Sequence, residues 1–230
     1  MKSLTTGSVA VAFFWMALGT PAREVQSHGL MFEKWLRDTF FGGYQPESST
    51  QKWDIPAVVN SHHGRIPVNP KAARYGSPVG LGDARRQFEI QEPFMLIVGF
   101  WQQEAKEQKC WVNVQTVTLA PERWAALWRP ITHADLERLE AVIKDKKLSL
   151  EEARAQAQAI KSQPPFTQAI IQVNPKIDAS QRRLQCSLRF ADFFKHLVPH
   201  ASPATQECPS VFGVPVPRSF KSAPRRFSPP

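Results

Sequence analysis

Acidic residues are scarce in this sequence of 230 residues: Asp and Glu number 20 against 29 Lys and Arg, which gives a formal net charge of +9. A basic excess favours an anionic partner, such as nucleic acid or a membrane surface. A role in solubility alone is the alternative interpretation. The apolar content of 42% excludes wholesale disorder and is sufficient for one sizeable folded domain.

Cysteine is also scarce. The three cysteines, Cys110, Cys186 and Cys208, are odd in number and lie far apart in the sequence. Because there is no C-x-x-C pair and no Cys–His spacing typical of zinc sites, a disulfide framework is not expected and a structural zinc is nearly excluded. Cys186 falls in an alternating pattern, which predicts a small buried hydrophobic side chain.

No apolar run approaches the roughly 20 residues that a transmembrane helix needs. Near the N-terminus, Lys2 precedes the apolar stretch 9–18, which is followed by Gly-Thr-Pro-Ala. This order is typical of a secretory signal peptide, although a buried helix or an early start codon would produce it too. Residues 1–22 are therefore interpreted as a signal peptide or an N-terminal extension. We expect a cytoplasmic protein, or an exported one if this segment is cleaved.

The C-terminal segment 201–230 contains seven prolines and carries three net positive charges. Proline lacks the backbone N–H that helices and strand ladders require. The segment is therefore predicted to be a mobile, basic tail that forms neither helix nor ladder. A single α/β domain is expected over residues 23–200.

Hydrophobic periodicity predicts a mixed order of helices and strands between these two ends. The continuous apolar run 94–101 indicates a fully buried central strand. The expected fold is α/β, with a central mixed sheet flanked by helices and with additional C-terminal helices and strands. Helices are expected at 28–41, 81–90, 132–144, 149–161 and 190–197, and strands at 51–59, 65–71, 94–101, 110–119, 168–173 and 182–189.

Polar residues at the ends of two early strands suggest a chemical site. Asp54 stands near Pro56, where turn formation is one reason for an aspartate and binding of a hard cation such as Mg²⁺ is another. Asn69 and Lys71 share one face of the next strand because side chains alternate. Asp54, Asn69 and Lys71 are predicted to converge at one end of a hairpin. A carboxylate-bound cation beside a lysine can hold a scissile phosphate and activate a water molecule.

This order of elements resembles the PD-(D/E)XK nuclease superfamily, and most of all its restriction-endonuclease-type members. The matching order is a helix with a glutamate, a strand with an aspartate, a strand with x-x-Lys, a short helix and a buried strand, over residues 28–119. The resemblance implies a restriction-endonuclease-like core and three catalytic residues. Glu33 matches the glutamate of the first helix, Asp54 the metal-binding aspartate, and Lys71 the lysine of the (D/E)XK element.

One position departs from the family pattern. Two residues before Lys71 the family has Asp or Glu, whereas this sequence has Asn69, whose carbonyl oxygen can bind a metal but brings no charge. In some members of the superfamily the following helix supplies the acid, and Asp83 lies near the start of that predicted helix. The resemblance thus implies Mg²⁺ held by Asp54, Asn69 and Asp83.

Basic and amide side chains in two segments are candidates for contact with nucleic acid. The alternative to nucleic-acid contact is a solvated helix face for the short predicted helix. For the strand 182–189 the alternative is an exposed edge strand whose charges prevent aggregation. Arg and Gln are side chains that read guanine and adenine in the major groove. The candidates are Arg85, Arg86 and Gln87 on the helix, and Arg183, Gln185 and Arg189 on the strand.

The sequence therefore predicts a Mg²⁺-dependent DNA endonuclease that hydrolyses phosphodiester bonds. A non-catalytic nucleic-acid-binding protein that keeps the fold is the first alternative, because Asn69 is uncharged. An exported protein of unrelated function is the second. The expected partner is DNA, and no membrane span is expected. A homodimer is considered as one possible oligomeric state.

Overall fold

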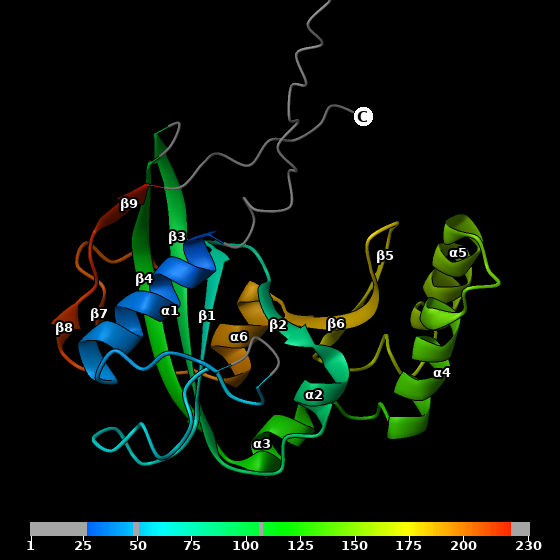
Figure 1. The fold of residues 1–230 in the computed structure, drawn as a ribbon, viewed down its shortest axis with the longest axis horizontal. Helices are drawn as coiled ribbons and strands as arrows, with labels where there is room; N and C mark the ends of the chain where they lie inside the picture. The colour runs from blue at the N-terminus through cyan, green and yellow to red at the C-terminus, as the bar shows by residue number, and fades with distance from the viewer. Residues whose placement is uncertain (1–26, 48–50, 106–107, 222–230) are drawn as a thin grey trace, which may run out of the picture.

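The computed structural model describes residues 27–47, 51–105 and 108–221, and within them a mixed α/β fold (Figure 1). The segment 1–22 lies outside the described residues. Helices are α1 (Ser27–Phe40), α2 (Ala84–Phe88), α3 (Pro121–Ala126), α4 (His133–Lys144), α5 (Leu150–Lys161) and α6 (Phe190–His196). Strands are β1 (Val68–Arg74), β2 (Val79–Asp83), β3 (Phe94–Ala105), β4 (Gln108–Leu119), β5 (Gln172–Ile177), β6 (Arg182–Leu188), β7 (Ser210–Val211), β8 (Val214–Pro215) and β9 (Ser219–Lys221).

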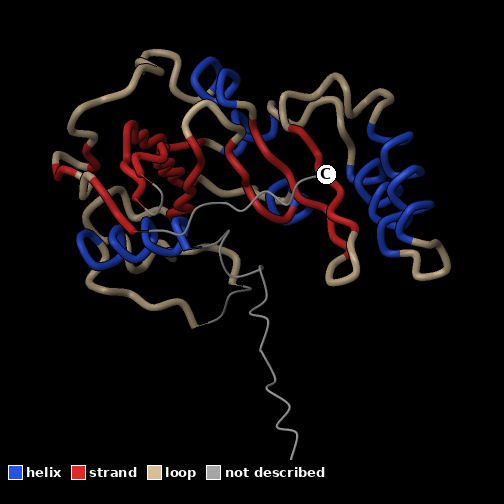
Figure 2. Tube along the Cα trace, turned by 90° about the horizontal axis from the view of Figure 1, so that it is seen from above, coloured by secondary structure: helices blue, strands red, loops and turns tan. Residues whose placement is uncertain are grey.

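The strands form a four-stranded mixed sheet in the order β1-β3-β4-β9 and a three-stranded antiparallel sheet in the order β2-β6-β5. A further small ladder joins β7 and β8. In the mixed sheet β1 runs parallel to β3, whereas β4 is antiparallel to both β3 and β9. Helices α4 and α5 stand at the end of the molecule away from the mixed sheet (Figures 1 and 2).

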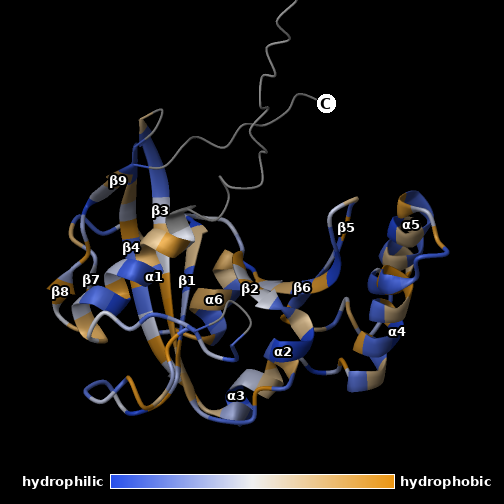
Figure 3. Cartoon of the chain, in the orientation of Figure 1, coloured by the Kyte–Doolittle hydropathy of each residue, from blue (hydrophilic) through white to orange (hydrophobic). Residues whose placement is uncertain are grey.

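Strand β3 is the centre of the core, as its apolar run predicts. Its first eight residues are buried and its last four are exposed, and Figure 3 shows the same change from hydrophobic to hydrophilic along the strand. Alternate residues face two different clusters: Leu96 packs with α3 and α6, whereas Ile97 packs with α1. Burial on both faces explains why this strand is apolar throughout instead of alternating.

Helix α1 lies directly against β3 because Gly99 has no side chain. A Cβ atom added at Gly99 would lie 2.9 Å from the rings of both Phe32 and Trp111. Phe32 and Leu36 are the residues of α1 that are almost fully buried in this contact. The close approach determines where α1 presents its polar residues.

Strands β1 and β5 each contain a proline, and both are edge strands of their sheets. The tetrapeptide Val-Asn-Pro-Lys begins at Val68 in β1 and again at Val173 in β5. An edge strand has one side without a full ladder, so the missing N–H of Pro70 or Pro175 removes no necessary hydrogen bond. The repeat thus reflects two similar edge positions in different sheets.

The structure corrects several predicted boundaries. Residues 51–59 form turns, and only Ile55 makes an isolated bridge, to Val68. The segment predicted as a helix from 81 begins as strand β2, and the helix starts at Ala84. Strand β5 begins four residues later than the predicted start at 168. The other predicted helices and strands are confirmed within a few residues, and β3 extends beyond 101.

The prediction of an unstructured tail is wrong for residues 201–221. Strand β9 pairs with β4, and buried Phe220 stacks on Trp111 with ring centroids 4.7 Å apart. Asn113 donates hydrogen bonds to the carbonyls of Ser202 and Ala204, at 3.2 and 2.7 Å. Side-chain donors and very short strands therefore accommodate a proline-rich chain. Residues 222–230 lie outside the described part.

Among the described residues, no helix has both the length and the apolar character needed to cross a membrane.

Candidate active site

Helix α1 presents Glu33 beside the edge of the mixed sheet. The side chain is 24% exposed, and Arg37, one helical turn later, places a guanidinium nitrogen 3.8 Å from its carboxylate. Arg37 is itself buried, at 8% exposed. The sequence interpretation missed Arg37, although the i,i+4 spacing from Glu33 is a readable signal for such a pair.

A short anchored segment positions Asp54. The next residue, Ile55, exchanges two backbone hydrogen bonds with Val68 of β1, at 3.1 and 2.8 Å. Gln51 donates to the carbonyls of Trp53 and Asp54, at 2.7 and 3.4 Å. Asp54 is thereby held against the start of β1, although its segment is not the predicted strand.

Lys71 lies on β1 and contacts Asp54 directly. Its Nζ donates to Asp54 Oδ2 at 3.0 Å and to the carbonyl of Pro70 at 2.9 Å. The lysine side chain is 18% exposed and the aspartate side chain 36% exposed. The pair is therefore partly shielded and partly exposed to solvent.

The pKa of Glu33 is raised from 4.5 to about 7. Burial is the largest cause, and the negative charge of Asp54 also raises it, whereas Lys71 and Arg37 lower it. Three groups from α1, the segment before β1, and β1 therefore act on one another electrostatically. Near neutral pH Glu33 is present in both protonation states, as a group that accepts and donates protons must be. We call Glu33, Asp54 and Lys71 the acid–lysine cluster.

Asn69 and Asp83 are the two remaining predicted metal ligands. Asn69 is only 5% exposed and alternation places it on the same face of β1 as Lys71. Burial raises the pKa of the Cys186 thiol, and the charges of Asp83 and Lys71 both act on it. Asp83 and Lys71 therefore both lie within electrostatic reach of Cys186. One oxygen of Asp83 is already used, because it caps α2 by accepting from the backbone N–H of Arg86 at 2.9 Å.

The donor set suits a hard cation that retains several waters. Glu33 and Asp54 are carboxylates that repel each other, and a divalent cation would relieve this repulsion. No three His, Cys, Asp or Glu residues gather in a metal-holding group in the part of the chain that the structure describes. Mg²⁺ is commonly bound by one or two carboxylates with water filling the other positions. Asp54 and the carbonyl of Asn69 fit that chemistry, and Glu33 lies within electrostatic reach of Asp54.

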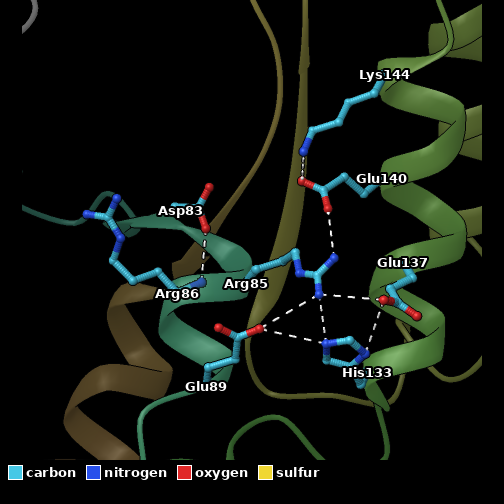
Figure 4. Close-up of polar contacts among 8 residues, drawn as sticks. All are labelled: Asp83, Arg85, Arg86, Glu89, His133, Glu137, Glu140 and Lys144. Carbon is cyan, nitrogen blue, oxygen red and sulfur yellow. Dashed lines mark hydrogen bonds and ion pairs between the residues drawn. The ribbon is translucent and has the colours of Figure 1, made fainter. Parts of the chain in front are cut away.

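Arg85 belongs to a second charged group, which joins α2 to α4 (Figure 4). Its guanidinium lies 3.2 Å from Glu140 Oε2 and 2.7 Å from His133 Nε2. Because arginine only donates, this nitrogen of His133 accepts. We call this group the α2–α4 ion-pair cluster; it comprises Arg85, Glu89, His133, Glu137, Glu140 and Lys144. Arg85 is thus engaged within the protein.

The two neighbours of Arg85 on α2 have different surroundings. Arg86 is 3.3 Å from the carbonyl of Gln51, so it links α2 to the segment that carries Asp54. Gln87 is 5% exposed and its Oε1 has no hydrogen-bond partner among the described residues. Gln87 therefore has no surface to offer a nucleic acid.

Strand β6 shows the predicted alternation, but it is the middle strand of the antiparallel sheet and not an edge. Arg183 is exposed and Gln185 half-buried on the face opposite Leu184. Arg189 caps α6, and its Nε donates to Asp192 at 2.7 Å. Arg183 and Gln185 therefore keep some exposure to solvent, and Gln185 is directly opposite Asp83 of β2.

Comparison with models of protein families, with curated proteins and with solved structures gives no match.

Proposed function

We propose that this protein is a metal-dependent endonuclease that hydrolyses phosphodiester bonds of DNA. The observation that carries the proposal is the meeting of Lys71 with Asp54 at 3.0 Å beside a Glu33 whose pKa is raised to about 7. Strongly shifted carboxyls with a specific charged partner are typical of catalytic sites. A restriction-endonuclease-like core is part of the proposal, supported by α1 packed on a sheet in which β1 is parallel to β3.

Each residue of the cluster has a distinct task in this proposal. Asp54 and the carbonyl of Asn69 would hold Mg²⁺, and Asp83 is the third candidate ligand. When bound, the cation supplies charge stabilisation and a more acidic water. Lys71 steadies the scissile phosphate with its ammonium group. Glu33 accepts a proton from the attacking water, which its pKa near neutrality permits.

The second candidate function is nucleic-acid binding without cleavage. It is favoured by Asn69, which is uncharged where the family pattern has an acid, and by the use of one Asp83 oxygen in capping α2. This alternative predicts binding that weakens steeply with salt and does not depend on a divalent cation.

Cleavage of supercoiled plasmid DNA in millimolar Mg²⁺ tests the first proposal. Lys71→Ala and Asp54→Asn are compared with the parent and with Lys195→Ala, which removes an exposed lysine from α6. We expect the parent and Lys195→Ala to cleave at similar rates, and the two site variants to be slower by about a hundredfold or more. Equal rates in the parent and Lys71→Ala, or no cleavage by the parent of duplex, single-stranded or RNA substrates, would overturn the enzymatic proposal.

A further inference from the structure

A basic pocket lies between helix α5 and the edge strand β5, at the far end of the antiparallel sheet from β2 (Figure 1). Its volume is about 360 Å³, and three of its lining residues, Arg154, Lys161 and Lys176, are basic. None of the residues that line it is acidic. Arg154 and Lys161 are two turns apart on α5, so they share one face of the helix.

The cations of this pocket lack compensating charge. Among the described residues, Lys161, Lys176 and the neighbouring Arg183 make no ion pair with a carboxylate. Arg154 uses its Nε to donate to the carbonyl of Ile177 at 2.8 Å, which fixes its guanidinium at the end of β5. Burial lowers the pKa of Lys161, and the charge of Lys176 lowers it further.

The strand register adds a fourth cation to the group. Lys176 of β5 is directly opposite Arg183 of β6, and both side chains are exposed. Like charges directly opposite each other destabilise a sheet. An anion placed among these side chains removes that cost. The same face continues through half-buried Gln185 toward β2.

We propose that this pocket binds a phosphate group of a nucleic-acid backbone, at a position separate from the acid–lysine cluster. This proposal rests on the proposed function for the identity of the ligand, DNA, and adds the place where the DNA backbone is bound. Arg154 and the two lysines are the phosphate ligands, and Arg183 extends the contact along the sheet. Phosphate contacts position a nucleic acid without reading its sequence, so the pocket aligns the substrate while the cluster acts on it.

The test is binding of a fluorescently labelled DNA duplex in EDTA, measured by anisotropy over a series of salt concentrations. The pocket variant is Lys161→Gln with Lys176→Gln. The control, Lys147→Gln with Lys195→Gln, removes two charges from exposed lysines elsewhere. We expect the pocket variant to bind about tenfold more weakly and its slope of log K against log salt to fall by about 1–2, because each phosphate contact contributes about 0.9. The control should lose less than about threefold affinity, with an unchanged slope.

Equal losses in the two double variants, or no loss in the pocket variant, would overturn the proposal. Inorganic phosphate is titrated in parallel, with the backbone amide signals of Asn174, Lys176 and Ile177 followed by NMR. Saturation by inorganic phosphate without any duplex binding would assign the pocket to free phosphate and overturn the nucleic-acid assignment. Failure of the catalytic proposal is seen separately, because binding is measured in EDTA, and the loss in the pocket variant does not depend on whether the parent cleaves DNA.

Discussion

Among the described residues, the α2–α4 ion-pair cluster and the acid–lysine cluster differ in how their charges are compensated. In the α2–α4 ion-pair cluster, the hydrogen bond to Glu140 raises the pKa of Arg85. Burial acts to raise the pKa of Glu140, but hydrogen bonds from Lys144 and Arg85 hold it below its ordinary value. Arg85 and Glu140 therefore stabilise each other's charged forms, and Figure 4 shows their side chains converging.

The acid–lysine cluster behaves in the opposite way. Glu33 is shifted toward its neutral form by burial and by Asp54, and Lys71 only partly compensates. A satisfied network is what stabilises a fold, whereas an unsatisfied carboxyl pair is costly unless a ligand or a reaction uses it. The comparison teaches that charge density alone does not locate a functional site, because the denser cluster here joins two helices.

The largest expected difference between the clusters is in catalysis. We expect Asp54→Asn to reduce the rate of Mg²⁺-dependent DNA cleavage by about 10²–10³-fold, since it removes a ligand charge and the partner of Lys71. Arg85→Gln should stay within about threefold of the parent, assayed well below its unfolding temperature. Single-turnover kinetics on one plasmid substrate make the comparison. A loss in Arg85→Gln as large as that in Asp54→Asn would remove the distinction.

The next prediction concerns the packing of α1 on β3, because this packing positions Glu33. Gly99→Ala places a methyl group 2.9 Å from the rings of Phe32 and Trp111. We expect a loss of about 1–3 kcal/mol in the free energy of unfolding, measured by urea denaturation. Gly80→Ala is the matched control on β2, because an added Cβ there meets nothing within 4 Å. A loss in Gly80→Ala equal to that in Gly99→Ala would contradict the close approach of α1 to β3.

The ion-pair cluster should contribute to stability alone. Arg85→Ala leaves Glu140, whose side chain is 11% exposed, with only Lys144 as a cationic partner. We expect a loss of about 1–2 kcal/mol in the free energy of unfolding. A double-mutant cycle with Glu140→Gln measures the coupling, expected at about 1 kcal/mol. Zero coupling would mean that the helices are held together by packing only.

The smallest expected effect is the pH dependence caused by Glu33. Its folded-state pKa, about 7, exceeds the ordinary 4.5, so the folded state binds more protons and stability falls as pH rises through this interval. The Glu33→Gln variant has no carboxyl group at this position, so its stability does not fall with pH for this reason. Relative to the parent, we expect the variant to gain stability progressively from pH 4.5 to pH 7, reaching about 1–2 kcal/mol. Chemical denaturation of both proteins across this pH range measures the effect. A difference in free energy of unfolding that does not change with pH would contradict the raised pKa.

The sequence carried enough information to bring Asp54 and Lys71 together. Side-chain alternation and the order of elements placed them at one sheet edge, and their 3.0 Å contact agrees. The expected strand for Asp54 did not form, because Pro56 limits pairing to the single bridge at Ile55. The local structure around Asp54 thus differs from the prediction, whereas the predicted contact between Asp54 and Lys71 is present.

The partners of α2 could not be predicted because they are distant in sequence. Arg85 has one local partner, Glu89, at the readable i,i+4 spacing. Its other acidic partners, Glu137 and Glu140, come from α4, and only the packing of α4 reveals them. The burial of Gln87 likewise could not be predicted from the sequence, since Gln87 is polar and stands between Arg86 and Phe88.

Calorimetric titration with Mg²⁺ at pH 7 tests the central claim most directly, because it requires no knowledge of the substrate. The acid–lysine cluster should bind one cation and release a fraction of a proton, since a divalent charge beside Glu33 lowers a pKa that starts at about 7. Asp54→Asn should abolish both effects, whereas Arg85→Gln should preserve them. Proton release that is absent in the parent, or unchanged in Asp54→Asn, would contradict the assignment of this cluster as a metal-dependent active site.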